Sequence, residues 1–335
     1  DVYKRQAQLF GLPTIDSPDH PIIKRDWQNT NFNKLNVSLS EIISGGPPKD
    51  GIPAIDDPQF LPAKQVDIGE TEPLIRLSIN GDTRAYPLRV LIWHEIVNDT
   101  VGGTPVAVTY CPLCNTSIVF DRRLNGQPAR FGTTGLLRNS DLVMYDNITE
   151  SWWQQFSGEA IVGDKTGEFL NIIASKVVSL QQILGENPDM PVLVPTREGA
   201  RNYGATPYVG YDDGTRNNAP FLFDGELPEG IYPMAYVAVV DGEAWSFDFL
   251  RQENPVVTDS GVTLTWMPGV ASALDTPRIS DAKDIGTITT TKNGQDTPHH
   301  VTFAFVYHAF TADGTLHHKV NEEPLRWMRE DESPQ

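Results

Sequence analysis

Alternating apolar and polar residues flank an Asn-Gly dipeptide at positions 80 and 81, and this pattern constrains the fold more than any other. The segment LIRLSINGDTRAYPL alternates as half-buried strands do, and Asn-Gly favours a two-residue hairpin turn. A second Asn-Gly, at 125 and 126, lies between two further alternating runs. Short helices are expected at PLRVLIWHEIVND and SLQQILGENP, where apolar residues recur three and four positions apart. The sequence therefore predicts a mainly β fold with a few short helices.

Two pairs of segments indicate an internal repeat. SINGDTRAYPL at 78–88 is similar to VVDGEAWSFDF at 239–249, and NDTVGGTPVAVTYCPLC at 98–114 is similar to the gapped TDSGVTLTWMPGV at 258–270. The alignment keeps a turn glycine, a core aromatic residue and a proline after the strand, as a shared scaffold requires. We therefore expect two tandem, divergent β-rich repeats.

The expected organisation follows from these repeats and from the segments between them. A Pro-, Asn- and Gly-rich stretch predicts an extended N-terminal arm, and a second such stretch predicts a connecting loop. The first six residues, DVYKRQ, have neither Met nor a signal-peptide pattern, so we expect them to be artefactual and the native N-terminus to be missing. The predicted parts are the arm at 1–50, the first repeat with a Cys/His site at 51–195, the loop at 196–230, the degenerate second repeat at 231–320 and a tail at 321–335.

Charge and hydropathy exclude some partners. The 335 residues include 44 acidic and 26 basic side chains, and the formal net charge is −18. Such a chain repels a phosphate backbone, so nucleic acid is not expected as a partner. No stretch approaches the roughly 18 apolar residues of a membrane-spanning helix.

The chain has two cysteines, and they lie three positions apart, at Cys111 and Cys114 in TYCPLCN. A Cys-x-x-Cys turn after a strand has three interpretations: small buried hydrophobic residues, a redox dithiol, or a pair of metal ligands at about 2.3 Å from one ion. In the second repeat the aligned positions hold Met267 and Val270. Packing alone therefore does not require the thiols.

For the metal interpretation, His94 is the candidate third ligand, because it precedes the strand that ends at Cys111 and has no counterpart in the second repeat. Two sulfurs and an imidazole suit copper or zinc. Met144 could add a weak thioether ligand that favours copper, or it could be a core residue. Glu95 is the candidate general base if an open coordination position holds water.

Two further groups of residues are candidates for a site. His299, His300, His308, His317 and His318 cluster late in the chain, but we expect them to be solvated rather than to form a second site. Trp152 and Trp153 either line a cleft for a small-molecule ligand or pack in the core, and the core is the simpler expectation.

The blocks from INGDTRAYPL to SIVFDRR, then GLLRNSDLVMYDNITESWWQQFSGEAIVG and NYGATPYVGY, resemble the bacterial family called domain of unknown function 3179 (DUF3179). The resemblance runs from about Gly51 to about Asp275 and carries no assigned activity. It implies that the segments 94–99 and 109–114 belong together. The resemblance also implies an exported protein. This sequence departs from the family pattern at Asn115, where a glycine is usual.

The leading functional hypothesis is an extracytoplasmic, periplasmic or secreted, protein that binds copper or zinc. One alternative is a thiol–disulfide oxidoreductase with Cys111 as the attacking thiolate and Cys114 as the resolving thiol. The other is a non-catalytic module that binds a ligand at its aromatic residues. Whether the protein is an enzyme stays open at this point.

Overall fold

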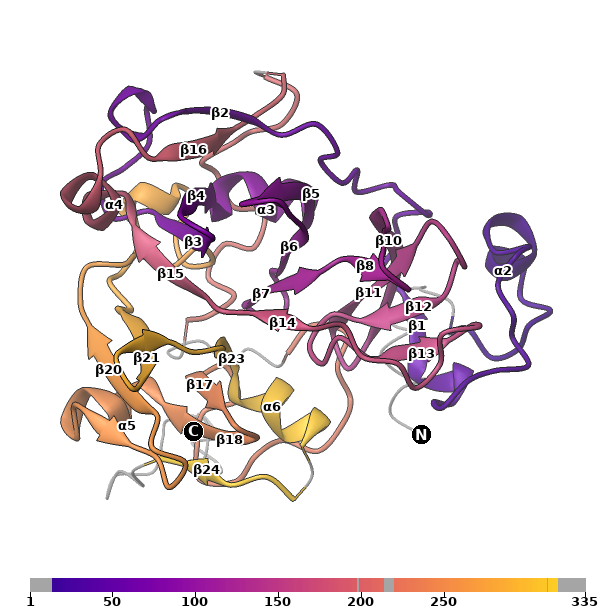
Figure 1. The fold of residues 1–335 in the computed structure, drawn as a ribbon. Coiled ribbons are helices and arrows are strands. Elements are labelled where there is room, and N and C mark those ends of the chain that lie inside the picture. Colours follow the sequence, from indigo (N-terminus) through magenta and orange to yellow (C-terminus); the bar gives the residue numbers. More distant parts are fainter. Residues whose placement is uncertain (1–13, 198, 214–219, 312, 319–335) are drawn as a thin grey trace, which may run out of the picture.

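A computed structural model describes residues 14–197, 199–213, 220–311 and 313–318 (Figure 1). The predicted artefactual start at 1–6 and the predicted tail at 321–335 lie outside these residues. The described chain is mainly β, with short helices, and its sheets have a β-propeller-like arrangement. The expected mainly β class with a few short helices is therefore confirmed. The α-helices are α2 (Pro21–Asp26), α3 (Leu88–His94), α4 (Leu180–Glu186), α5 (Phe247–Gln252) and α6 (Ala304–Phe310), and the 3₁₀ helices are η1 (Leu39–Glu41), η2 (Ala63–Gln65) and η3 (Ile279–Asp281).

The predicted Asn-Gly hairpins form as expected. Asn80 and Gly81 join β3 to β4, and Asn125 and Gly126 join β8 to β9, all with positive φ. This is the backbone of a type I′ turn, which Asn and Gly adopt more easily than other residues. Both predicted helices form as well, but α3 ends at His94, and the following residues of its predicted segment enter β5 instead.

Two sheets and a small ribbon come from the segment between β2 and β16. One sheet has the order β15-β3-β4-β16-β2 and the other β14-β7-β6-β5, while β8 and β9 form the ribbon. The strands are β2 (Gln59–Pro62), β3 (Pro73–Ile79), β4 (Asp82–Pro87), β5 (Ile96–Val101), β6 (Thr104–Cys111), β7 (Thr116–Asp121), β8 (Arg123–Leu124), β9 (Gln127–Pro128), β14 (Ile172–Ile173), β15 (Ser175–Ser179) and β16 (Pro191–Val194).

A third sheet, in the order β1-β10-β11-β12-β13, combines part of the arm with a segment inserted between β7 and β14. We call it the inserted sheet. Its strands are β1 (Ile42–Ser44), β10 (Phe131–Arg138), β11 (Asp141–Asp146), β12 (Trp152–Gln154) and β13 (Ala160–Val162). The arm packs against it through Trp27, whose ring makes edge contacts with Tyr145 and Trp152. Apolar burial thus fixes the arm in place.

The C-terminal sheets have the orders β23-β17-β18-β24 and β19-β20-β21-β22. Their strands are β17 (Tyr236–Val240), β18 (Glu243–Ser246), β19 (Val256–Val257), β20 (Thr263–Met267), β21 (Thr287–Lys292), β22 (Gln295–Asp296), β23 (His300–Phe303) and β24 (Leu316–His317).

The element order of β3 to β16 recurs from β17 to β24. In each case a strand, a two-residue turn, a strand and a short helix lead into a second sheet, and the chain then returns through a strand, a helix and a last strand. The last strand pairs in parallel with the strand after the turn, β16 with β4 and β24 with β18. The stretch from β8 to β13 has no counterpart, because only Asn293 and Gly294 separate β21 from β22.

Candidate metal centre

The Cys-x-x-Cys turn joins β6 to β7. Cys111 ends β6, Cys114 lies in the turn, and both are free, buried thiols. Asn115 completes the turn with a φ of 50°, and its N–H donates to the Pro112 carbonyl at 3.2 Å. A positive φ disfavours most residues but is tolerated by Gly and Asn, so asparagine suits this position.

Contacts from distant parts of the chain hold this turn. The Cys114 carbonyl accepts hydrogen bonds from the Phe303 N–H at 3.1 Å and the Thr302 hydroxyl at 3.0 Å, both on β23. The Leu113 carbonyl accepts one from the Tyr211 hydroxyl at 3.1 Å. The turn is therefore docked onto the C-terminal sheets and onto the loop between the two halves.

The inserted sheet brings Asp141 to the two thiols. One carboxylate oxygen of Asp141 and the sulfurs of Cys111 and Cys114 all lie within 4.8 Å of one another, and all three residues are buried. We call these three side chains the Cys–Asp cluster. Asp141 begins β11, immediately after the two-residue turn Asn139-Ser140, in which both residues have positive φ. The sequence prediction missed Asp141, although it directly follows a turn inside one of the family-like blocks.

The Asp141 carboxylate is only partly satisfied by protein donors. One oxygen accepts from the Gln154 side chain at 2.6 Å and from the Phe156 N–H at 2.8 Å. The other oxygen is buried and accepts no N–H or O–H group of the described residues, while the thiols of Cys114 and Cys111 are the remaining donors to this carboxylate. Burial raises the pKa of Asp141 to about 6, and burial also raises the pKa values of both thiols. These groups are therefore costly to charge without a cation.

Glu95 lies beside the Cys–Asp cluster without joining it. Its backbone has a φ of 60° at the end of α3, and its side chain is buried. Burial raises its pKa to about 8, and the negative charge of Asp141 adds to this effect. Within the described part of the chain, no lysine, arginine or histidine forms an ion pair with Glu95 or Asp141. The site thus concentrates acidic groups that have no protein counter-charge.

His94 is not among the side chains that the structure brings to the thiols. Its Nδ1 lies 2.8 Å from the Pro53 carbonyl oxygen and its Nε2 lies 2.8 Å from the Tyr203 hydroxyl. Its ring stacks on that of Tyr203 with a centroid distance of 5.9 Å. Both ring nitrogens are therefore engaged away from the Cys–Asp cluster, while the positive φ of the next residue turns Glu95 toward it.

The other predicted residues also lie outside the Cys–Asp cluster. Met144 is fully buried and lies three residues along β11 from Asp141, which separates their Cα atoms by about 10 Å. Trp152 and Trp153 have no exposed surface, and the Trp153 indole N–H donates to Asp146. The two rings thus occupy the positions of core residues.

The late histidines do not gather into a metal site within the described residues. The expectation that these histidines are solvated is wrong for His299, which is buried and whose Nδ1 lies 2.7 Å from the Thr290 hydroxyl. His317 stacks on Trp245 and lies 2.8 Å from a carboxylate oxygen of Glu243. Separate polar and aromatic contacts account for these two.

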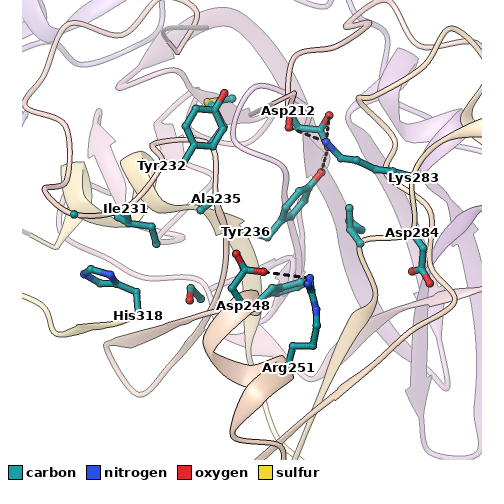
Figure 2. A pocket seen from close by; sticks show the side chains of 15 residues that line it. Asp212, Ile231, Tyr232, Ala235, Tyr236, Asp248, Arg251, Lys283, Asp284 and His318 are labelled. Carbon is teal, nitrogen blue, oxygen red and sulfur yellow. Dashed lines mark hydrogen bonds and ion pairs between the residues drawn. The ribbon is translucent and has the colours of Figure 1, made fainter. Parts of the chain in front are cut away.

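A cavity of about 330 Å³ opens beside α5 and β17 (Figure 2). Figure 2 shows Tyr236 and Lys283 directed at Asp212, and Asp248 paired with Arg251. The Asp212 carboxylate accepts from the Tyr236 hydroxyl at 2.5 Å and lies 3.3 Å from the Lys283 ammonium group. Internal pairing therefore satisfies most of the charge in this cavity.

Comparison with known proteins places most of the chain in one family. The model of the family described as "Protein of unknown function (DUF3179)" matches residues 49–318. No curated protein and no solved structure matches the chain. Among the described residues, no helix is both long enough and apolar enough to cross a membrane. The chain belongs to the DUF3179 family.

Proposed function

We propose that this member of the DUF3179 family is an extracytoplasmic metal-binding protein that holds one divalent cation, zinc rather than copper, at Cys111, Cys114 and Asp141. The observation that carries the proposal is the convergence of two thiols and a carboxylate oxygen within 4.8 Å in a buried site. Sulfur and carboxylate oxygen are both ordinary zinc ligands, and zinc accepts them in tetrahedral sites.

The donor set distinguishes zinc from copper. Copper or zinc was expected from two sulfurs and an imidazole, and a thioether would have favoured copper, but the group that meets the sulfurs is a hard carboxylate oxygen instead. Soft, reduced copper favours thiolate and thioether, whereas zinc tolerates mixed sulfur and oxygen donors. Glu95 or a water molecule would complete the shell, and in the second case Glu95 would be placed to accept a proton from that water.

A cation also explains why acidic groups gather where no basic side chain compensates them. Burying a carboxylate and two thiols in the core is unfavourable unless the groups stay protonated or meet a positive charge. A bound divalent cation supplies that charge, and it deprotonates coordinating thiols. It would also use the Asp141 oxygen that accepts no N–H or O–H group of the described residues.

The same features count against a thiol–disulfide oxidoreductase. An attacking cysteine needs an accessible thiolate, which a following helix N-terminus often stabilises. Here the turn leads into β7, both sulfurs are buried, and their pKa values are raised by burial. In an oxidising compartment, a metal would also keep the pair from closing into a disulfide.

We further infer that the two halves are divergent copies of one unit. The shared element order, the parallel pairing of each last strand and the aligned turn glycines support this inference. The Cys–Asp cluster would then be a later addition to the first copy, since Met267 and Val270 replace the cysteines and no inserted sheet follows β21. An exported location is supported by the family-like blocks alone, and fractionation of cells that express the full natural gene would test it.

Metal analysis of protein purified without added metal tests the proposal. We expect about one equivalent of zinc in the unsubstituted protein, and we expect Cys111→Ser and Asp141→Asn each to remove most of it. His94→Gln is the matched control, because both nitrogens of this residue contact other groups, and it should keep the zinc.

Two results would contradict the proposal. One is zinc that persists in Asp141→Asn but is lost in His94→Gln, which would restore the imidazole as a ligand. The other is metal-free protein that reduces a model disulfide, which would support the oxidoreductase.

A further inference from the structure

A second cavity, of about 450 Å³, lies beside β16 and the start of α3, and no residue of the Cys–Asp cluster lines it. Figure 1 shows this region at the top of the molecule, where β2 and β16 lie next to β4 and α3. Its volume is in the range of ordinary small-molecule sites. Much of the wall is aliphatic, formed by Leu61, Val66, Ile68, Val90, Val192 and Val194.

Arg89 presents a fixed guanidinium group to this cavity. Its Nε lies 2.9 Å from a carboxylate oxygen of the buried Glu72, and its Nη1 donates to the Asp67 carbonyl at 3.0 Å. Gly204 lies directly against it, since a Cβ atom at that position would come within 2.0 Å of Nη2. The side chain is therefore held by contacts on several sides before any ligand arrives.

Arg201 brings a second guanidinium group, which forms no ion pair among the described residues. One acidic residue, Asp67, accompanies the two arginines among the described residues of the lining. Acidic side chains outnumber basic ones on this chain, whose net charge is −18. An arginine that lines a cavity and pairs with none of the described carboxylates therefore indicates an anionic ligand. The planar guanidinium group matches a carboxylate, as it does a phosphate, through two parallel hydrogen bonds.

Tyr203 lines the same cavity, and His94 sets the direction of its hydroxyl. The Pro53 carbonyl can only accept, so the Nδ1 of His94 carries the proton, and the neutral ring accepts at Nε2 from the Tyr203 hydroxyl. The hydroxyl oxygen of Tyr203 is then left as an acceptor. A ligand would have to offer it an O–H or N–H group.

We propose that this cavity binds a small carboxylic acid with an aliphatic body and a hydroxyl group next to the carboxylate. Arg201 and Arg89 hold the carboxylate, Tyr203 accepts from the hydroxyl, and the aliphatic wall covers the chain. The site is independent of the metal centre, and it gives His94 a role in positioning Tyr203.

Calorimetric titration of the full chain with 2-hydroxyoctanoate, octanoate and octanamide tests this proposal. We expect 2-hydroxyoctanoate to bind about fivefold more tightly than octanoate, the effect of one hydrogen bond, and octanamide to bind at least about tenfold more weakly than octanoate. Arg201→Gln should weaken both acids by about tenfold or more. Tyr203→Phe should abolish the preference for the hydroxy acid.

Arg251→Gln is the matched control, because Arg251 lines the other cavity and should not affect binding. Equal loss in Arg201→Gln and Arg251→Gln, equal binding of octanoate and octanamide, or no binding of either acid at millimolar concentration would overturn the proposal. Equal affinity for the two acids would overturn the role of Tyr203. Thermal unfolding of each variant shows whether the substituted protein is folded, and loss of zinc in Cys111→Ser has no bearing on the outcome.

Discussion

Single residues with a positive φ determine which side chains reach the candidate metal centre. Glu95, Asn115 and Ser140 all adopt this conformation, which costs an ordinary residue about 1 kcal/mol or more. Each occurs where the chain changes direction next to the Cys–Asp cluster. Other residues with a positive φ, such as Asn80 and Asn125, lie in hairpin turns elsewhere, so the conformation marks the candidate site only together with the Cys–Asp cluster.

Asn115 allows a direct test at this scale. Replacing it by alanine should lower the free energy of unfolding by about 2 to 3 kcal/mol, because alanine disfavours positive φ and the Tyr110 hydroxyl loses its acceptor at 3.1 Å. Asn115→Gly should cost about 1 kcal/mol less, since glycine accepts the backbone conformation.

Urea unfolding of the two variants measures the difference. In a Tyr110→Phe background the cost of Asn115→Gly should shrink, because the hydrogen bond is already absent. Equal destabilisation by glycine and alanine would show that the backbone conformation does not matter at this position.

Among the elements, the β10–β11 hairpin brings Asp141 to the two thiols of the Cys–Asp cluster. Its two strands pair with each other up to the turn, where Arg138 lies opposite Asp141. Asp141 is the first residue after the turn. The carbonyl of Ser140 also lies 3.3 Å from the Cys114 sulfur. Any change in the turn conformation should therefore move the carboxylate relative to the thiols.

Asn139→Ala should lower stability by about 1 kcal/mol and weaken zinc binding several-fold, since alanine is disfavoured at the φ of 51° that this turn requires. Asn139→Gly should retain zinc affinity more fully. Competition with a chromophoric chelator measures this affinity.

Asn125→Ala is the control, because Asn125 has the same φ in the β8–β9 turn, which holds no residue of the Cys–Asp cluster. It should reduce stability by a similar amount and leave zinc affinity unchanged. If both alanine variants changed zinc affinity equally, the conformation of the β10–β11 turn would have no specific role in metal binding.

At the scale of the whole molecule, the two halves share one hydrophobic core. The largest core cluster joins Tyr86 and Phe120 from the first half with Phe303 and Phe305 from the second. The docking of the Cys-x-x-Cys turn on β23 links the halves further. We therefore expect the two halves to unfold in one cooperative transition.

Because His299 is buried, we expect its titration to make the free energy of unfolding depend on pH. Burial lowers its pKa from 6.5 to about 4, so between these values the unfolded chain binds a proton that the folded chain does not. The buried His300 acts in the same direction, whereas the raised pKa values of Glu95 and Asp141 act in the opposite direction. The contribution of His299 alone should therefore lower the free energy of unfolding by roughly 1.4 kcal/mol per pH unit as the pH drops from about 6.5 to about 4. This contribution ends below about pH 4.

Urea unfolding between pH 4 and 7 measures the slope. In His299→Gln the slope should be smaller by the contribution of about one proton, roughly 1.4 kcal/mol per pH unit, because the substituted side chain does not titrate. An unchanged slope in this variant would assign the acid sensitivity to other groups.

The amino-acid sequence by itself determined the local features of this protein. The β class, the hairpins at Asn80-Gly81 and Asn125-Gly126, and the positions of α3 and α4 follow from periodicity and turn chemistry, which act over a few residues. The proximity of Cys111 to Cys114 is local for the same reason.

Tertiary structure decided which partners meet the thiols. Asp141 reaches them because an inserted sheet folds back, and no short-range pattern encodes a contact between residues about thirty positions apart. The side chains of His94 and Glu95 diverge because Glu95 adopts a positive φ, so adjacency in the sequence did not predict a shared site. Side-chain direction at a chain reversal depends on the packing of the whole fold, and that packing joins distant segments whose sequences carry no common signal.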